Sequence, residues 1–213
     1  MFQHEIKLWR RGYIVVGVDE VGRGAFAGPI VAAACAFDPS IRQLADKMRS
    51  KDIIINDSKL LTQKQREQAS LWIKNHCIVH SVSAVDVRMI NKIGIVKANI
   101  VAMRKAVVQL INQLNETASF FVLSDYFHIP RLRGVGRNRQ KNLVHGDKLS
   151  FSIAAASIIA KVERDRLMRD LSKKHNKYKW HLNKGYGTEH HRKTLQMYGK
   201  TELHRDTFVQ NYI

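Results

Sequence analysis

The sequence predicts an α/β domain with a mixed central β-sheet flanked by helices. Two apolar runs open the chain, at residues 13–18 and 30–37. Further short apolar runs, at residues 77–85 and 119–123, alternate with segments of helical periodicity. Strands followed by alternating helices and strands are typical of an α/β domain.

The first two strands are predicted to form a hairpin-like opening. Residues 13–18 (YIVVGV) are apolar and β-branched, as expected of a short buried strand. A glycine-rich turn separates them from the second strand, residues 30–37, which is broken by Pro39. Because both runs are almost wholly apolar, we expect both strands to lie centrally in the sheet.

Helical patterns cover most of the remaining chain. The pattern becomes helical from Ile41, is interrupted at residues 56–59, and resumes over residues 62–75. Thr62 and Gln65 have the spacing of a capping box, in which each side chain satisfies an unpaired backbone donor. Further helices are expected at residues 95–115, at residues 150–171, where small residues pack closely against the sheet, and as two pieces in the last 40 residues.

The chain is strongly basic. It has 36 Lys and Arg residues against 18 Asp and Glu, a formal net charge of +18 and a sequence pI near 10.2. Such a domain repels itself, and the usual compensation is a polyanionic partner, with DNA or RNA first and an anionic membrane surface second. Residues 131–145 (RLRGVGRNRQKNLVH) are the most basic stretch, and we expect a surface loop that contacts phosphates.

The sequence predicts a cytoplasmic protein with no membrane partner. The first apolar run is short and is followed at once by acidic residues, unlike a signal peptide. The longest apolar segment, residues 153–160, is far shorter than the ~20 residues that span a bilayer. Cys35 and Cys77 each lie in an apolar run, as expected of small buried residues in a reducing compartment.

Four acidic residues lie where predicted strands end or a helix begins. Asp19 and Glu20 follow the first strand, Asp125 ends the fourth, and Asp147 precedes the helix of small residues. Each acid alone is most often a surface ion pair or a helix cap. Together they are typical of a site for two divalent cations, which relieve repulsion between carboxylates and support phosphodiester cleavage. The acids alone indicate a metal-dependent nuclease and leave its substrate open.

A glycine-flanked arginine directly follows the first acidic pair. In Gly22-Arg23-Gly24, the glycines allow backbone amides to approach a ligand and the arginine offers a forked donor to a phosphate. Elsewhere this tripeptide would indicate only a tight turn. Beside strand-end carboxylates it indicates a clamp for the phosphate that is cleaved.

Seven motifs follow one another along the chain: DEVGRG at 19–24 with AGP at 27–29, NDSKL at 56–60, SDY at 124–126 with Pro130, GD at 146–147, AAASIIAK at 154–161 with RD at 164–165, KGYGT at 184–188, and HR at 204–205. In this order, over residues 13–208, they resemble the motifs of ribonuclease HII, of the type 2 ribonucleases H.

The resemblance implies a ribonuclease H-like fold, with a catalytic domain over residues 1–172 and a helical C-terminal region, residues 173–213, that completes the substrate groove. It implies a metal-dependent endoribonuclease that uses Mn²⁺ or Mg²⁺. Its substrates would be RNA/DNA hybrids and duplex DNA containing single ribonucleotides, which it would incise on the 5′ side of the ribonucleotide, leaving 3′-hydroxyl and 5′-phosphate ends. We expect the enzyme to be a monomer.

The resemblance also implies roles for individual residues. Asp19, Glu20, Asp125 and Asp147 match the catalytic metal-binding acids, with Asp165 as the alternative for the fourth. Substrate-binding roles fall to five residues: Gly22, Arg23 and Gly24 at the 2′-hydroxyl and the adjacent phosphate, Tyr186 against the next sugar, and Lys59 near the reacting phosphate. This matches the chemistry, because the 2′-hydroxyl distinguishes RNA from DNA at a single position.

Two other functions are compatible with parts of the sequence. A non-catalytic basic nucleic-acid-binding protein would explain the charge but would leave Asp19, Glu20 and Asp125 without a role. Another nuclease of the ribonuclease H-like superfamily, such as a resolvase or transposase core, would explain the acids but not the glycine-flanked arginine or Tyr186.

Overall fold

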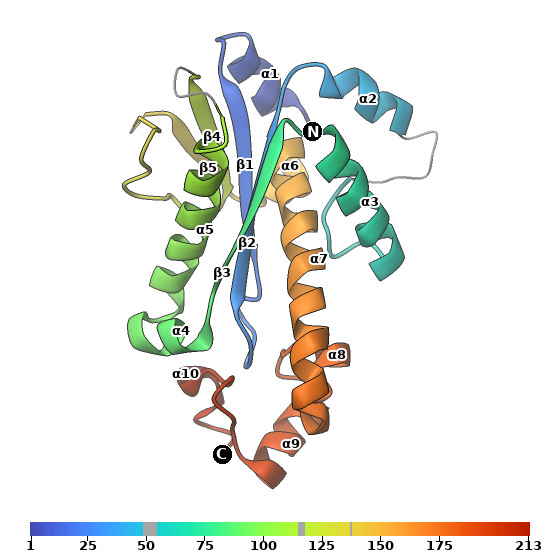
Figure 1. The fold of residues 1–213 in the computed structure, drawn as a ribbon, viewed down its shortest axis with the longest axis vertical. Helices are drawn as coiled ribbons and strands as arrows, with labels where there is room; N and C mark the ends of the chain where they lie inside the picture. The colour runs from blue at the N-terminus through green and yellow to red at the C-terminus, as the bar shows by residue number, and fades with distance from the viewer. Residues whose placement is uncertain (49–54, 115–117, 137) are drawn as a thin grey trace.

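A mixed five-stranded sheet lies at the centre of the computed structural model, which describes residues 1–48, 55–114, 118–136 and 138–213 (Figure 1). Parts of three predicted segments lie outside the described residues: residues 49–54 of the helical pattern from Ile41, residue 115 of the helix at 95–115, and residue 137 of the basic stretch. The strands are β1 (Ile14–Val21), β2 (Ile30–Phe37), β3 (Val79–Val85), β4 (Phe120–Asp125) and β5 (Gln140–Leu143). Their order is β3-β2-β1-β4-β5; β2 runs antiparallel to β1 and β3, whereas β4 runs parallel to β1 and β5.

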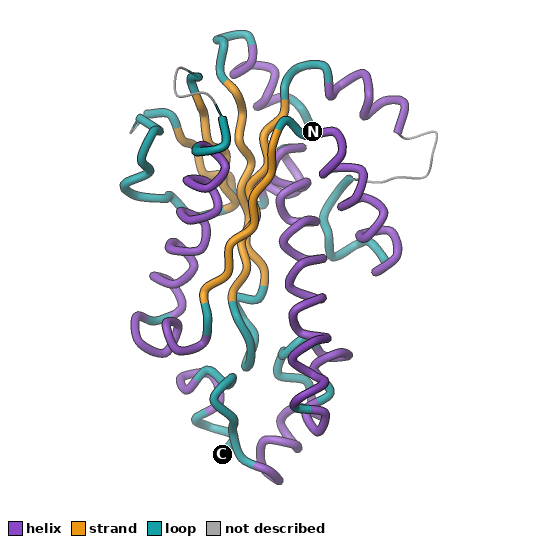
Figure 2. The backbone as a smooth tube through the Cα atoms, viewed as in Figure 1, coloured by secondary structure: helices purple, strands orange, loops and turns teal. Residues whose placement is uncertain are grey.

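Helices cover both faces of this sheet. The helices are α1 (Gln3–Trp9), α2 (Ile41–Met48), α3 (Gln63–His76), α4 (Val87–Ile93), α5 (Ile95–Ile111), α6 (Gly146–Leu149), α7 (Phe151–Lys174), α8 (Trp180–Asn183), α9 (Glu189–Tyr198) and α10 (Asp206–Val209). Figure 2 shows the sheet between a layer formed by α4 and α5 and a layer formed by α7 and α3. The predicted α/β fold with a mixed sheet is therefore confirmed.

The second strand shows why its sequence is continuously apolar. All eight residues of β2 are buried, because each face of the sheet is covered. Ala32 and Ala34 belong to the core on the α5 side, whereas Ala33 and Cys35 belong to the core on the α7 side. This strand has the bounds that the sequence predicts.

The helix of small residues packs closely on the sheet, as predicted. A Cβ atom at Gly17 of β1 would lie 2.1 Å from the backbone carbon of Ser152, so only glycine allows α7 to approach this near. Ser150 caps the helix by accepting a hydrogen bond from the Ile153 amide. The capping box at Thr62 and Gln65 of α3 is likewise confirmed.

Several boundaries differ from the prediction. Strand β1 continues to Val21 rather than ending at residue 18, since Asp19 and Glu20 still pair with Ala33 and Ala32 of β2. The helix α7 likewise continues to Lys174 rather than ending near residue 171, whereas β4 ends at Asp125, as predicted. Apolar periodicity underestimates β1 and α7 because polar residues lie in their final segments.

Four elements were not predicted at all, one of them the short helix α6. The basic segment 131–145, expected to be a loop, contains the edge strand β5, whose residues are mostly polar and pair through their backbone with β4. The short helix α4 precedes α5, which was predicted over residues 95–115 and ends at Ile111, and α1 precedes the first strand. In α1, the buried Glu5 accepts hydrogen bonds from the Ser150 hydroxyl and the Ser152 amide, a long-range contact with no local signature.

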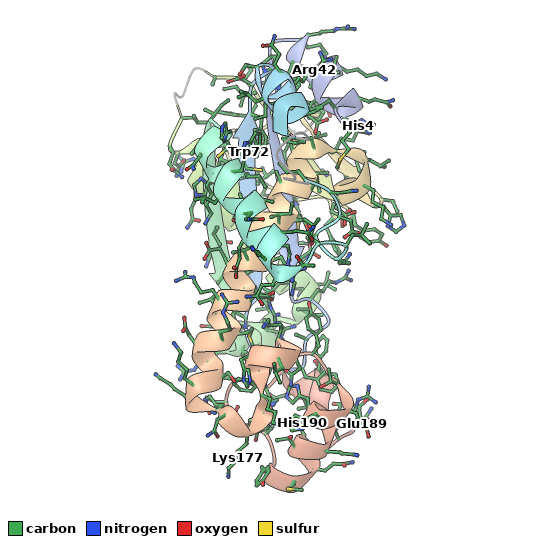
Figure 3. All side chains as sticks on the ribbon, turned by 90° about the vertical axis from the view of Figure 1, so that its right-hand side faces the viewer. His4, Arg42, Trp72, Lys177, Glu189 and His190 are labelled. Carbon is green, nitrogen blue, oxygen red and sulfur yellow. The ribbon has the colours of Figure 1, made fainter. Side chains whose placement is uncertain are left out.

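The C-terminal region consists of three short helices and a 3-10 turn at Asn176–Tyr178, where two helical pieces were expected. It packs on the end of α7 around a core that includes Met168, Trp180 and Leu195. Lys177, Glu189 and His190 of this region lie at the opposite end of the molecule from His4 and Arg42 (Figure 3). The domain boundary at residue 172 stays a prediction.

Both cysteines were expected to be buried, and this holds for one of them. Cys35 is buried, Cys77 is half-buried, and both are free thiols. Among the helices that the structure describes, none is long and apolar enough to cross a membrane.

Candidate active site

A pocket of about 240 Å³ lies where β1 and β4 end at one edge of the sheet. All nine of the predicted site residues line it, together with Val21, Ser58, Ser157 and Lys161. The nine are Asp19, Glu20, Gly22, Arg23, Gly24, Lys59, Asp125, Asp147 and Tyr186. A larger cavity of about 470 Å³ beside α7 contains none of them, and its lining is mainly apolar.

Strand pairing brings the first acids together. Val18 of β1 pairs with Ser124 of the parallel strand β4, so Asp19 and Asp125, the residues that follow, reach the same edge of the sheet. Asp147 lies in α6, and the amide of Gly146, its neighbour, donates to Asp125 Oδ1 at 2.7 Å. Ligands of open α/β sheets bind at the carboxyl ends of strands, and these acids lie there.

Burial and mutual repulsion raise the pKa values of three of these acids. Burial, followed by the charges of Glu20 and Asp125, raises the pKa of Asp19 well above its ordinary value. Burial and the charge of Asp125 raise the pKa of Glu20 to about 7. Burial and the charge of Asp147 raise the pKa of Asp125, against the hydrogen bond from Gly146. Perturbed pKa values in a cleft are typical of functional sites.

The carboxylates line one pocket without converging on one point. Over the described residues, no three His, Cys, Asp or Glu side chains are already drawn together as metal ligands. Within the same residues, Glu20 Oε2 is buried and has no hydrogen-bond partner, which leaves a lone pair available to a cation. The four acids supply only oxygen donors, the type that Mg²⁺ and Mn²⁺ prefer.

Lysines surround the acids. Lys59 Nζ lies 3.9 Å from Asp147 Oδ2, and its side chain is 82% exposed, so the ammonium faces the solvent at the pocket mouth. Lys161 Nζ also lines the pocket and forms an ion pair of 2.7 Å with Asp165. Asp165, the alternative fourth acid, is therefore engaged by Lys161 and is not among the lining residues, whereas Asp147 is.

The glycine-flanked arginine forms a tight turn held from behind. Gly22 has a φ of +96°, and a Cβ there would lie 2.0 Å from Arg164 Nε. Glycine is thus required at this position by the fold. At Gly24, by contrast, a Cβ would meet nothing within 4 Å, and the backbone is not left-handed. The fold alone therefore does not require glycine at Gly24, which lines the pocket.

Tyr186 reaches the pocket from the C-terminal region. The Gly185 carbonyl accepts hydrogen bonds from the Phe26 and Ala27 amides, at 2.8 and 3.1 Å. A Cβ at Gly187 would lie 2.3 Å from the Phe26 ring. The glycines around Tyr186 therefore let its loop lie directly on the segment that follows the glycine-flanked arginine. The Arg164 guanidinium lies 5.3 Å from the Tyr186 ring centroid.

Sequence reasoning assigned no role to Ser58, Ser157 or Lys161, which also line the pocket. Ser157 and Lys161 are four residues apart on α7, so they share one helix face. The hydroxyls of Ser58 and Ser157 lie 3.0 Å apart and join the loop before α3 to α7. The spacing of Ser157 and Lys161 was the available signal, but the apolar residues around them indicated only core packing.

The sequence is similar to those of known proteins. The sequence matches the ribonuclease HII family over residues 16–211. It is 41% identical to ribonuclease HII of Caldicellulosiruptor bescii over 215 residues, covering 100% of this chain and 95% of that protein.

Solved structures share the fold. The crystal structure of ribonuclease H2 from Pyrococcus horikoshii has a TM-score of 0.73 at 24% identity, covering 93% of this chain and 96% of that one. Bst-RNase HIII in complex with Mn²⁺ has a TM-score of 0.72 at 22% identity, covering 91% of this chain and 65% of that one. The family match, which spans nearly the whole sequence, shows that this chain belongs to the ribonuclease HII family and is a metal-dependent ribonuclease H.

Proposed function

We propose that this enzyme incises duplex DNA on the 5′ side of single embedded ribonucleotides and hydrolyses the RNA strand of RNA/DNA hybrids. The products are 3′-hydroxyl and 5′-phosphate ends. One observation carries the proposal: the four acids, the Gly22–Gly24 turn and Tyr186 line a single pocket. The pocket thus combines groups suited to phosphodiester hydrolysis with groups suited to a ribose.

Asp19, Glu20, Asp125 and Asp147 are the residues that would hold the divalent cations. Their oxygen donors, their burial and the unpartnered Glu20 Oε2 fit Mg²⁺ or Mn²⁺. When bound, the two cations supply activation of the attacking water and stabilisation of the leaving 3′ oxygen. The Mn²⁺ in the structure of Bst-RNase HIII, a protein of the same fold, supports this assignment.

The chain's own cations hold the substrate backbone. Lys59 stands at the pocket mouth with its ammonium exposed, and Lys161 is fixed on the inner side by Asp165. Arg23 extends from the turn, with its guanidinium 4.6 Å from the Phe127 ring centroid. These groups are placed to bind the cleaved phosphate and its neighbours, since Lys and Arg dominate contacts to nucleic-acid backbones.

The 2′-hydroxyl is recognised by the turn and by Tyr186. A hydroxyl both donates and accepts, so backbone amides and carbonyls of the Gly22–Gly24 turn can bond to it. The absence of a side chain at Gly24 gives the sugar room to approach. Tyr186 forms the other side of the pocket and packs against the sugar that follows the ribonucleotide. All of these groups belong to one chain, which supports the action of a monomer.

The test is a cleavage assay on end-labelled duplexes. One duplex contains a single ribonucleotide, one is a long RNA/DNA hybrid, and one is all DNA. With Mg²⁺ or Mn²⁺, we expect one incision immediately 5′ of the ribonucleotide, many in the hybrid, and none in DNA; chelation should stop all cleavage. The new 3′ end should prime a DNA polymerase. Equal cutting of the DNA control would contradict the proposal.

A further inference from the structure

We propose that the His204–Arg205 dipeptide is a positioning element that holds the Gly22–Gly24 turn and Tyr186 in register with each other. This inference rests on the proposed function, because it explains how the two groups that contact the ribonucleotide keep their relative placement. Neither residue lines the pocket, and both are buried, with 1% and 0% of their surface exposed. They therefore act through other residues and do not touch the substrate.

Arg205 holds the turn from behind. Its guanidinium donates to the carbonyls of Gly22 at 2.7 Å and Arg23 at 2.9 Å, and twice to the Gly28 carbonyl, at 2.8 and 3.1 Å. No carboxylate of the described residues pairs with it, so its charge is neutralised by backbone dipoles alone. The five N–H donors of a planar guanidinium can make these four hydrogen bonds at once, whereas a lysine ammonium has only three donors.

His204 acts on Tyr186 through His191. The Thr201 amide donates to His204 Nδ1 at 2.9 Å. Because a backbone amide can only donate, Nδ1 must be the acceptor, and the proton of neutral His204 is on Nε2. That nitrogen lies 3.1 Å from Nε2 of His191.

The proton positions then follow along the whole chain of hydrogen bonds. Nε2 of His191 accepts from His204 and also from the Trp180 indole at 3.3 Å. The proton of His191 is therefore on Nδ1, which donates to the backbone carbonyl of Tyr186 at 2.9 Å. Every bond from Thr201 to Tyr186 runs in one direction, so the network fixes one position of the Tyr186 backbone.

Burial keeps both imidazoles neutral. Burial and the neighbouring His191 lower the pKa of His204 to about 4, and burial lowers the pKa of His191. The rings are enclosed by Tyr178 and Trp180, whose centroids lie 4.8 and 5.4 Å from that of His204. A proton added to either ring would place two N–H groups opposite each other and break the chain.

Residues 26–28, which follow the Gly22–Gly24 turn, connect the His204–Arg205 dipeptide to the loop that carries Tyr186. The Arg205 amide donates to Phe26 and the Gly28 amide to Leu203, at 2.8 and 2.9 Å. On its other side, this same segment donates to Gly185, the residue before Tyr186. A shift of the His204–Arg205 dipeptide would thus move the turn and Tyr186 together.

The hydrogen bonds from His204 through His191 to Tyr186 are tested with two variants of His191. In His191→Asn, the side-chain amide takes the place of Nδ1 and can still donate to Tyr186; in His191→Gln, it takes the place of Nε2 and cannot. We expect His191→Gln to lose at least about tenfold in kcat/KM on the single-ribonucleotide duplex, the effect of one lost hydrogen bond at a site, and His191→Asn to retain most activity. The control is His190→Gln, an exposed neighbour (Figure 3), which should match the wild type.

A double-mutant cycle distinguishes a loss of Tyr186 positioning from a general loss of structure. In the Tyr186→Ala background, His191→Gln should cause no further loss, because the ring that it positions is gone. An additional tenfold loss there, with folding intact by thermal denaturation, would overturn the inference. Equal activity of the His191→Asn and His191→Gln proteins would also overturn it.

The hydrogen bonds from Arg205 to the Gly22–Gly24 turn are tested with Arg205→Lys, which keeps the positive charge and loses the forked guanidinium. We expect KM for the ribonucleotide duplex to rise more than kcat falls, since the turn that contacts the ribose is released; Arg166→Lys, at an exposed ion pair, is the matched control. A change in kcat alone would contradict this role.

Tautomers give a readout that needs no activity. Long-range ¹H–¹⁵N spectra of the wild type at pH 8 should show His191 protonated on Nδ1 and His204 on Nε2, and His204 should be unchanged at pH 5.5. The opposite tautomer at either residue would overturn the inference. Failure of the wild type to prefer ribonucleotides would instead refute the proposed function, while this measurement still decides the network.

Discussion

Replacing Glu20 with glutamine should stabilise the fold in the absence of divalent cations, although it removes a carboxylate of the active site. The ionised Glu20 side chain is held beside Asp125 in a buried position, and its pKa is raised to about 7 from an ordinary 4.5. The folded state therefore binds a proton more tightly than the unfolded state. Above pH 7, the folded state carries an unfavourable charge that glutamine does not have.

The magnitude follows from this difference in pKa. The pKa rises from 4.5 in the unfolded chain to about 7 in the folded protein. Since each pKa unit corresponds to ~1.4 kcal/mol, the penalty at pH 8 is about 3 kcal/mol. The sign is that of a carboxylate with a raised pKa: the contribution of Glu20 to the free energy of unfolding should fall as pH rises from 4.5 to 7 and then level off. In Glu20→Gln this contribution to the pH dependence should disappear.

The assay is urea denaturation in EDTA at pH 5 and pH 8. Glu20→Gln should exceed the wild type by up to about 3 kcal/mol at pH 8 and by much less at pH 5. The control is Glu163→Gln: burial raises the pKa of Glu163, but ion pairs with Lys74 and Arg166 outweigh it and hold the pKa below its ordinary value. That variant should lose stability. A Glu20→Gln protein less stable than the wild type at pH 8 would refute the reasoning.

Three further predictions concern activity and binding. Asp125→Asn should abolish cleavage while duplex binding persists, because the net charge of +18 becomes more positive; cleavage and gel-shift assays in one buffer decide this, and loss of binding would argue against a catalytic role. Tyr186→Ala should reduce kcat/KM on single-ribonucleotide duplexes about tenfold, the scale of one lost stacking contact, and affect long hybrids less; equal losses would count against its role. Duplex affinity should fall roughly 10³-fold or more between 50 and 200 mM salt, as for 6–10 phosphate contacts, and a flat titration would contradict backbone binding.

Much of the fold could be predicted because burial and periodicity agree along the central elements. Strand β2 is apolar throughout since both of its faces are covered, and α7 carries small residues where Gly17 admits it to the sheet. The prediction failed where an element owes its structure to distant partners. Strand β5 is polar and exists because its backbone pairs with β4, and α1 buries Glu5 against the start of α7.

In the candidate active site, too, local patterns could be predicted and contacts between distant residues could not. Acids at strand ends could be predicted, because parallel neighbours place Asp19 and Asp125 at one edge. The contacts of the supporting residues could not, although His204 and Arg205 form one of the motifs that carry the resemblance. Arg205 and His204 stand far along the chain from the turn and Tyr186 that they hold, and their bonds go to backbone carbonyls and buried rings. Such contacts leave no pattern in the sequence, since any residue supplies a carbonyl.

The most direct test of the central claim compares three duplexes that differ at one sugar. The position carries a ribonucleotide, a 2′-O-methyl ribonucleotide or a deoxyribonucleotide, and kcat/KM is measured for each with Mg²⁺ or Mn²⁺. If the Gly22–Gly24 turn and Tyr186 recognise a free 2′-hydroxyl beside the four acids, only the ribonucleotide duplex should be cut, 5′ of that sugar. Comparable cutting of the deoxyribonucleotide or methylated duplex would contradict the account.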